Sequence, residues 1–217
     1  MGGLNCAGIL WALLSTLATL FIVGSLLYPE WLIGRVTVDG VSSTAYFGAY
    51  KRCNYPIYDK DSKRVALMTE CGRYESFAAV PSVAWQASII VAGTSACLSM
   101  LLTLLLIPSI CMNDIITRST SIIVGFFQVL TVMGVAASLA LYAAGWDNPE
   151  VKDACGNEAD RFQLGTCHVG RAFLCMGLGA FILCLCAMLS ICGGKKTKDD
   201  RDELIRGFEN TRLDLAK

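Results

Sequence analysis

Residues 172–194 read AFLCMGLGAFILCLCAMLSICGG, a stretch without a single Asp, Glu, Lys or Arg. Three other stretches share this property, at residues 1–29, 76–113 and 119–146. A helix needs about 20 mainly apolar residues to cross the hydrocarbon core of a bilayer, and each stretch is long enough. The sequence therefore predicts four membrane-spanning helices, near residues 8–28, 83–107, 121–144 and 171–191.

Composition favours a membrane protein over a soluble one. Of the 217 residues, 54% are hydrophobic and only 17% are charged, which is too apolar for an ordinary soluble domain. A soluble protein with four buried helices is the alternative, but too little polar chain remains to cover them. The formal net charge is zero, so charge gives no general reason to expect a nucleic acid as partner.

The first apolar helix is expected to stay in the protein. No basic segment precedes it, and its apolar stretch is longer than the roughly 7–15 residues typical of a cleaved signal peptide. The chain then divides into a membrane domain at residues 1–194 and a tail at residues 195–217. For the tail, a short amphipathic helix and disorder are both open possibilities.

Orientation rests on the basic residues that lie close to the helix ends. The first long loop, at residues 29–82, and the tail carry seven Lys and Arg each, so their number alone does not decide the orientation. The positive-inside rule weighs residues near a helix end most strongly, and Lys195, Lys196, Lys198 and Arg201 directly follow the fourth helix. We therefore expect a plasma-membrane protein with both termini cytoplasmic and with the loops at 29–82 and 145–170 outside.

Cysteine placement agrees with that orientation. Of eleven Cys, seven lie in or at the ends of the apolar spans, and four lie in the two outer loops: Cys53, Cys71, Cys155 and Cys167. An even number of Cys in an oxidising compartment indicates disulfides. Four Cys allow three pairings, and we favour pairing within each loop because each ring then closes locally. A zinc site that uses His168 is the alternative, but the Cys-x-x-Cys spacing and a second His are missing.

The first outer loop is too long for a simple connector. Aromatic and β-branched residues predict strands at 31–38, 45–53 and 65–71, which would form a small antiparallel sheet. The turn between the last two strands is predicted from residues that favour turns, namely Asn54, Pro56, Asp59, Asp61 and Ser62. Tyr28, Trp31 and Trp146 stand at predicted helix ends, where aromatic residues commonly anchor a protein at the membrane interface.

The predicted spans offer little chemistry. They hold no ionisable residue at membrane depth, where a transporter or pump normally places one. Gln128 is the most polar candidate, and we favour a hydrogen bond to a neighbouring helix of the same chain over contact with a partner. No Ser-His-Asp set or phosphate-binding loop occurs. We therefore expect no catalytic residue, cofactor, metal or small-molecule substrate.

Several short motifs together resemble a known family. Trp31, the segment Phe47-Gly48-Ala49-Tyr50, Cys53 and Cys71 resemble the first-loop pattern of the claudin superfamily, although Tyr50 stands where that pattern has Trp. More specific segments resemble the lipoma HMGIC fusion partner-like tetraspan family and its founding member: Gly145-Trp146-Asp147, Cys155-Gly156 and Leu164-Gly165-Thr166-Cys167. The resemblance implies a four-helix membrane bundle under a small extracellular antiparallel sheet, with disulfides Cys53–Cys71 and Cys155–Cys167.

The resemblance also implies a role. Members of this family resemble accessory subunits, so we expect the chain to bind a channel or receptor protein within the lipid bilayer. A claudin-like part in cell junctions or adhesion is the alternative, because the first-loop pattern is shared with claudins. An autonomous pore is the weakest hypothesis, since no polar stripe along the spans would line it.

Overall fold

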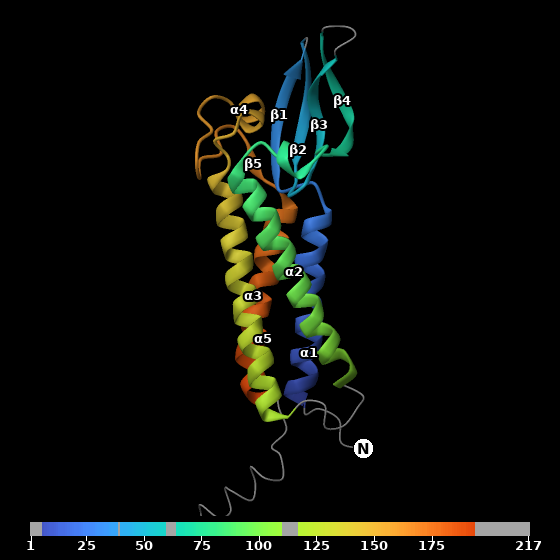
Figure 1. The fold of residues 1–217 in the computed structure, drawn as a ribbon, viewed down its shortest axis with the longest axis vertical. Coiled ribbons are helices and arrows are strands. Elements are labelled where there is room, and N and C mark those ends of the chain that lie inside the picture. The colour runs from blue at the N-terminus through green and yellow to red at the C-terminus, as the bar shows by residue number, and fades with distance from the viewer. Residues whose placement is uncertain (1–5, 39, 60–63, 110–116, 194–217) are drawn as a thin grey trace, which may run out of the picture.

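The protein forms a bundle of long helices with a β-sheet at one end (Figure 1). The computed structural model describes residues 6–38, 40–59, 64–109 and 117–193. The tail at 195–217 and the turn residues Asp61 and Ser62 lie outside the described residues. Within the described residues, four helices are long and apolar enough to cross a membrane, and the sheet is antiparallel throughout. The predicted fold class is therefore confirmed.

The four long helices begin and end close to the residues expected from the sequence. They are α1 (Cys6–Leu27), α2 (Val83–Ser109), α3 (Arg118–Ala144) and α5 (Arg171–Gly193). Helix α3 begins three residues before the predicted position 121, because the Thr117 hydroxyl accepts a hydrogen bond from the Thr120 backbone N–H and caps the helix. Helix α2 continues through Pro108, which lies in its last turn.

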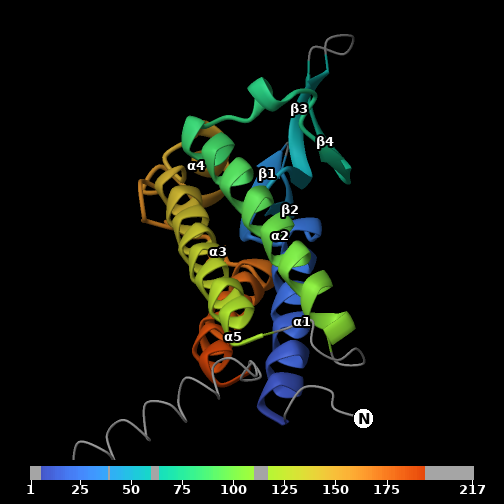
Figure 2. The ribbon, with the colours of Figure 1, turned by 60° about the horizontal axis from the view of Figure 1, so that its bottom comes forward.

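Helix α5 packs against both α1 and α3, and α2 packs mainly against α3 (Figure 2). Buried polar side chains join these spans. Gln128 is fully buried; its amide accepts a hydrogen bond from Trp11 Nε1 at 3.0 Å and donates one to Ser15 Oγ at 2.8 Å. Gln128 thus connects α3 to α1 within the chain, as the sequence analysis favoured. In the same way, the Thr19 hydroxyl of α1 meets that of Thr103 in α2 at 2.8 Å.

The sheet has five strands in the order β4-β3-β2-β1-β5. The strands are β1 (Leu32–Val38), β2 (Val41–Phe47), β3 (Lys51–Asp59), β4 (Arg64–Arg73) and β5 (His168–Val169). Strand β5 comes from the second loop and pairs with β1, so that both loops build one sheet. The second loop also forms a short helix, α4 (Pro149–Cys155), which packs against β1. We call the sheet together with α4 the cap.

Two predictions about the first loop were wrong. The predicted strand at 45–53 is divided between β2 and β3 by a turn, because the Gly48 N–H bonds to the Lys51 carbonyl at 2.7 Å and reverses the chain. Asn54 and Pro56 belong to β3 and do not form a turn. Asn54 has a positive φ of 54° at an irregularity in the pairing of β3 with β4, a conformation that Asn tolerates better than most residues. Asn54 therefore stands where one residue of β3 lies opposite two residues of β4, between the pairs Cys53–Cys71 and Tyr55–Met68.

Candidate functional site

The cap is joined to the helix bundle by a layer of buried aromatic residues. Trp31 and Trp85 are fully buried, and Tyr142 is 1% exposed. The Tyr142 ring stacks on Trp85 at 4.8 Å between centroids and meets the edge of Trp31 at 4.9 Å. These residues come from the start of the first loop, from α2 and from α3. Their rings therefore hold three parts of the chain together where the spans meet the sheet.

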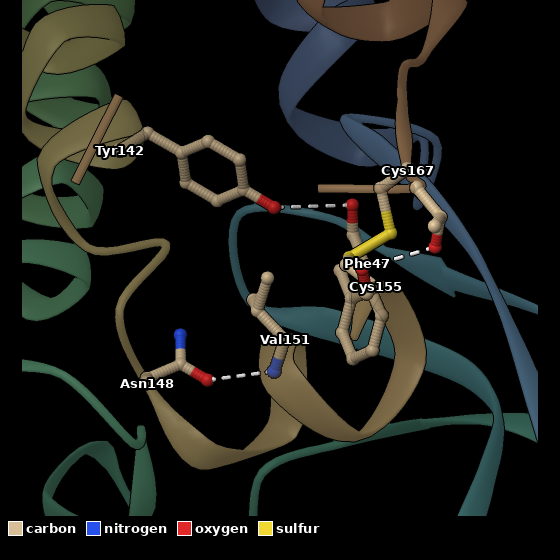
Figure 3. The surroundings of a disulfide bond; sticks show 7 residues. Phe47, Tyr142, Asn148, Val151, Cys155 and Cys167 are labelled. Atoms are coloured by element: carbon tan, nitrogen blue, oxygen red, sulfur yellow. Dashed lines mark hydrogen bonds between the residues drawn. A yellow bond between two sulfur atoms is a disulfide. The ribbon is translucent and has the colours of Figure 1, made fainter. Parts of the chain in front are cut away.

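Hydrogen bonds give these rings fixed positions. Trp31 Nε1 donates to the Ser25 carbonyl at 2.7 Å, and Trp85 Nε1 donates to the Tyr142 carbonyl at 2.9 Å. The Tyr142 hydroxyl donates to the Phe47 carbonyl at 3.3 Å (Figure 3). Buried indole and phenol groups normally need such partners, and here the partners are carbonyls at a helix end, in a helix and at a strand end.

The interfacial-anchor prediction was wrong for two of its three residues. Trp31 is 0% exposed and Trp146 is 6% exposed, so neither ring can lie among lipid headgroups. Only Tyr28, at 62% exposure, is placed as an anchor would be. Sequence position at a helix end does not separate an anchor from a residue that is covered by a folded cap.

Two glycines of the family motifs, Gly145 and Gly48, stand where a side chain would not fit. At Gly145, an added Cβ would lie 2.5 Å from Trp85 Cδ1, so this glycine lets the end of α3 approach α2. At Gly48, it would lie 2.7 Å from the Pro29 Cα, so the turn between β2 and β3 can rest on the start of the loop. These two motif positions therefore serve the joint between cap and bundle.

The second loop is held by a disulfide between Cys155, at the end of α4, and Cys167, next to β5 (Figure 3). Helix α4 begins where the Asn148 side chain accepts from the Val151 N–H at 3.0 Å, with Pro149 in its first turn. It ends at Gly156, which has a φ of 86°. Such a conformation suits glycine far better than residues with a side chain.

Gly165 closes the loop around that disulfide. Its φ is 56°, and an added Cβ would collide with the carbonyl oxygen of Cys155. That same oxygen accepts hydrogen bonds from the Thr166 N–H at 2.9 Å and from its hydroxyl at 3.0 Å. The motif residues Gly156 and Gly165 therefore shape the backbone that carries the disulfide.

In the first loop, a disulfide joins Cys53 of β3 to Cys71 of β4, which are directly paired in the sheet. Both disulfides thus connect cysteines of one loop, which is the pairing that the sequence analysis favoured. His168 is an exposed residue of β5. Within the described ranges, no group of three or more His, Cys, Asp or Glu is placed to hold a metal ion.

A charged and aromatic cluster connects the two loops. The Arg52 guanidinium lies 3.9 Å from the ring centroid of Tyr55 and 4.7 Å from that of Tyr74. It forms an ion pair with Glu150 of α4, and the Tyr74 hydroxyl donates to the same carboxylate at 2.9 Å. Burial, and secondly the negative charge of Glu150, raise the pKa of Tyr74. We call Arg52, Tyr55, Tyr74 and Glu150 the latch.

The latch was only partly visible in the sequence. Arg52 and Tyr55 lie within two positions of the motif residue Cys53, and Tyr74 follows Cys71 by three positions. Nothing in the spacing indicates that Glu150, 98 positions after Arg52, completes the cluster. A further ion pair joins Asp147, a motif residue, to Arg161 within the second loop at 3.0 Å. Of the motif residues, Trp31, Gly48 and Gly145 therefore lie at the joint between the cap and the spans. Asp147, Gly156 and Gly165 instead shape the second loop.

Phe162 is an unexpected feature of the second loop. It is 63% exposed and has a φ of 60°, a conformation in which Phe is rarely found. Its N–H donates to the Ala143 carbonyl at 3.1 Å, and Asp160 and Gln163 on either side exchange backbone hydrogen bonds of 3.2 and 2.8 Å. The loop thus holds an aromatic ring on the surface in a strained backbone conformation.

Comparisons with known proteins agree with the motifs. A sequence model of the family described as "Lipoma HMGIC fusion partner-like protein" matches residues 7–195. The chain is 28% identical over 211 residues to the zebrafish (Danio rerio) "LHFPL tetraspan subfamily member 2a protein", with 91% of each chain covered. It is 27% identical over 210 residues to the human "LHFPL tetraspan subfamily member 2 protein", again with 91% of each covered. It is also 27% identical to a zebrafish subfamily member 3 protein, with 87% of this chain and 82% of the relative covered. Placement next to the founding member stays a prediction.

Proposed function

The chain belongs to the lipoma HMGIC fusion partner-like family of tetraspan membrane proteins, and from that premise we propose that it is a non-enzymatic accessory subunit. It binds an ion channel or receptor protein in the plasma membrane and helps to assemble, traffic or gate that complex. Both termini lie in the cytoplasm and the cap lies outside. The basic residues after α5 and the disulfides of the cap support this orientation.

The proposal rests on the position of Phe162, whose side chain the second loop holds at the surface in a strained backbone conformation. Strained backbone conformations persist only where the surrounding structure enforces them, and they cluster at functional sites. Here the enforced conformation presents an aromatic side chain that is 63% exposed. Aromatic residues are enriched among the residues that contribute most to protein–protein binding. The second loop therefore offers a contact for a partner protein.

The joint below the cap supports an accessory role. Strand β5 pairs with β1, and the Gly170 N–H donates to the Trp31 carbonyl at 2.8 Å directly before α5 begins. The latch and the aromatic layer add further connections between the loops and the spans. A partner that binds both the cap and the membrane-spanning surface would therefore meet one continuous, firmly joined body.

The test compares three forms of the tagged full-length protein in cells that express it naturally: the wild type, Phe162→Ala and Phe181→Ala. Phe181 is the matched control, since it is 62% exposed but lies on α5 in the membrane. After solubilisation in mild detergent, quantitative mass spectrometry measures the proteins that co-purify. We expect a channel or receptor polypeptide in near-stoichiometric amount with the wild type and the control, and a reduced amount with Phe162→Ala.

Recovery of the wild type alone would contradict the accessory-subunit proposal. Recovery with junction or adhesion proteins would favour the claudin-like alternative, especially if the protein also caused non-adherent cells to aggregate. Equal recovery of a channel or receptor with all three forms would keep the accessory role and reject Phe162 as the contact.

A further inference from the structure

A groove lies between α1 and α5 at the end of the spans that faces the cap. The groove is open on one side and has a volume of about 330 Å³. Its lining runs along α1 from Leu20 to Ser25, continues through Tyr28 and Glu30, and is completed by Arg171, Ala172 and Cys175 of α5. The groove borders the aromatic layer at Ser25, whose carbonyl accepts the Trp31 hydrogen bond, but neither the latch nor the proposed partner contact uses it.

Gly24 keeps the groove open. A Cβ added to Gly24 would find no atom within 4 Å, although the residue lies in a helix that packs on α5. The neighbouring Ser25 hydroxyl donates to the Ile22 carbonyl of its own helix at 2.8 Å. The walls next to Gly24 are formed by Leu20 and Phe21, so the membrane part of the groove is apolar.

The rim of the groove is charged with both signs. Arg171 donates from Nε and from one terminal nitrogen to the two carboxylate oxygens of Glu30, at 3.0 and 3.2 Å. The Arg171 side chain is 84% exposed, and a guanidinium has five N–H groups, so three remain to bind another anion. Tyr28, which is 62% exposed, places an aromatic ring at the same end.

The length of the groove matches one leaflet. One wall runs from Leu20 in α1 to Tyr28, directly after α1, whose N–H still donates to the Gly24 carbonyl as in a helix. These eight steps measure about 12 Å at a rise of about 1.5 Å per residue. The hydrocarbon core of a bilayer is about 30 Å thick, so one leaflet provides about 15 Å. A partner helix that crosses both leaflets would find this groove along less than half of its length, whereas a lipid of one leaflet would fill it.

We propose that this groove binds one phospholipid with a phosphocholine headgroup from the leaflet on the cap side. An acyl chain lies over Gly24 between Leu20 and Cys175. The phosphate accepts hydrogen bonds from Arg171, and the quaternary ammonium lies near the Glu30 carboxylate and the face of Tyr28, where cations bind aromatic rings. The Arg171–Glu30 pair carries no net charge, so a zwitterionic headgroup matches the rim better than a headgroup with a net negative charge.

The experiment uses the full-length protein in detergent after lipids have been washed away. Native mass spectrometry then counts molecules of added dioleoylphosphatidylcholine, dioleoylphosphatidylglycerol or cholesterol bound to the wild type, Gly24→Leu and Gly93→Leu. Gly93 is the matched control because an added Cβ there also finds no atom within 4 Å, but it lies on α2. Both variants are therefore expected to fold, which circular dichroism checks.

We expect the wild type and Gly93→Leu to bind one phosphatidylcholine, and Gly24→Leu to bind it about tenfold more weakly, because the leucine occupies the place of the acyl chain. Glu30→Gln should reduce the preference for phosphatidylcholine over phosphatidylglycerol. Equal binding by all forms would show bulk lipid only and overturn the proposal. Tight binding of cholesterol in place of phosphatidylcholine would also overturn the proposal if Gly24→Leu abolished that binding. So would a membrane protein that co-purifies with the wild type and with Gly93→Leu but not with Gly24→Leu.

Discussion

At the scale of single residues, glycines decide how closely the parts of this protein approach. Gly156 and Gly165 have positive φ values of 86° and 56° around the second disulfide. Gly145 leaves room for Trp85. Gly24 and Gly93, in contrast, have open space where a side chain would lie. The same residue type therefore marks a structural requirement at some positions and free surface at others.

Gly165→Ala should destabilise the protein. The new Cβ would collide with the Cys155 carbonyl oxygen, and alanine disfavours a φ of 56°. We expect a loss of about 1–3 kcal/mol in the free energy of unfolding, the usual cost of such strain. Thermal unfolding in detergent measures the change, with Gly93→Ala as the control that should be neutral or slightly stabilising. If Gly165→Ala unfolded at the same temperature as the wild type, the loop would have to relax without loss of stability.

At the scale of helices and strands, polar contacts fix which faces meet. Between α1 and α3, Gln128 bonds to Trp11 and Ser15, and between α1 and α2, Thr19 bonds to Thr103. Lipid is as apolar as the helix faces, so burial of apolar surface does not select one helix contact over another in the membrane. These few polar pairs and the close approaches at small residues therefore specify the arrangement.

A double-mutant cycle tests the bond between Trp11 and Gln128. Gln128→Leu should cost about 0.6–2 kcal/mol, the range for hydrogen bonds between membrane helices. The double variant Trp11→Phe/Gln128→Leu should lose less stability than the two single variants together, because either change alone already breaks the bond. Thr131→Val is the control on α3, since the Thr131 hydroxyl donates to the Phe127 carbonyl of its own helix. Additive effects would show that the two side chains do not interact energetically.

At the scale of the whole molecule, one joint links two loops that are far apart in the sequence. The latch connects β3 and β4 to α4, and β5 adds the second loop to the sheet of the first. The aromatic layer then fixes both to the spans. The cap is therefore fixed to α1, α2, α3 and α5, each of which begins or ends at this joint.

The latch predicts a specific loss of stability at high pH. The pKa of Tyr74 is raised above its usual value of 10.0 by burial and by Glu150, so the fold favours the neutral phenol. This contribution is present below pH 10 and is lost as the pH rises above about 10, where the unfolded tyrosine ionises. The wild type should therefore lose more thermal stability between about pH 9 and 11 than Tyr74→Phe, which cannot ionise. If the thermal stability of the two proteins fell equally between about pH 9 and 11, the latch geometry would be contradicted.

The spans and the cysteine pairing within each loop were accessible to sequence reasoning. Length and the absence of charge indicate a membrane helix without any tertiary information. The strands were harder to predict, because residues 45–53 have strand character on both sides of the turn at Gly48. The burial of Trp31 and Trp146 and the role of Glu150 depend on how the two loops fold over each other, which no local pattern reports.

The sequence by itself determined that the chain spans a membrane four times and which family it resembles, because hydrophobic length and short ordered motifs are local properties. Only the tertiary structure decided that both loops form one sheet, that Arg52 meets Glu150, and that α1 and α5 leave a groove at Gly24. These features arise between segments more than 90 residues apart. Their energies depend on packing, and packing is settled only when the whole chain has folded.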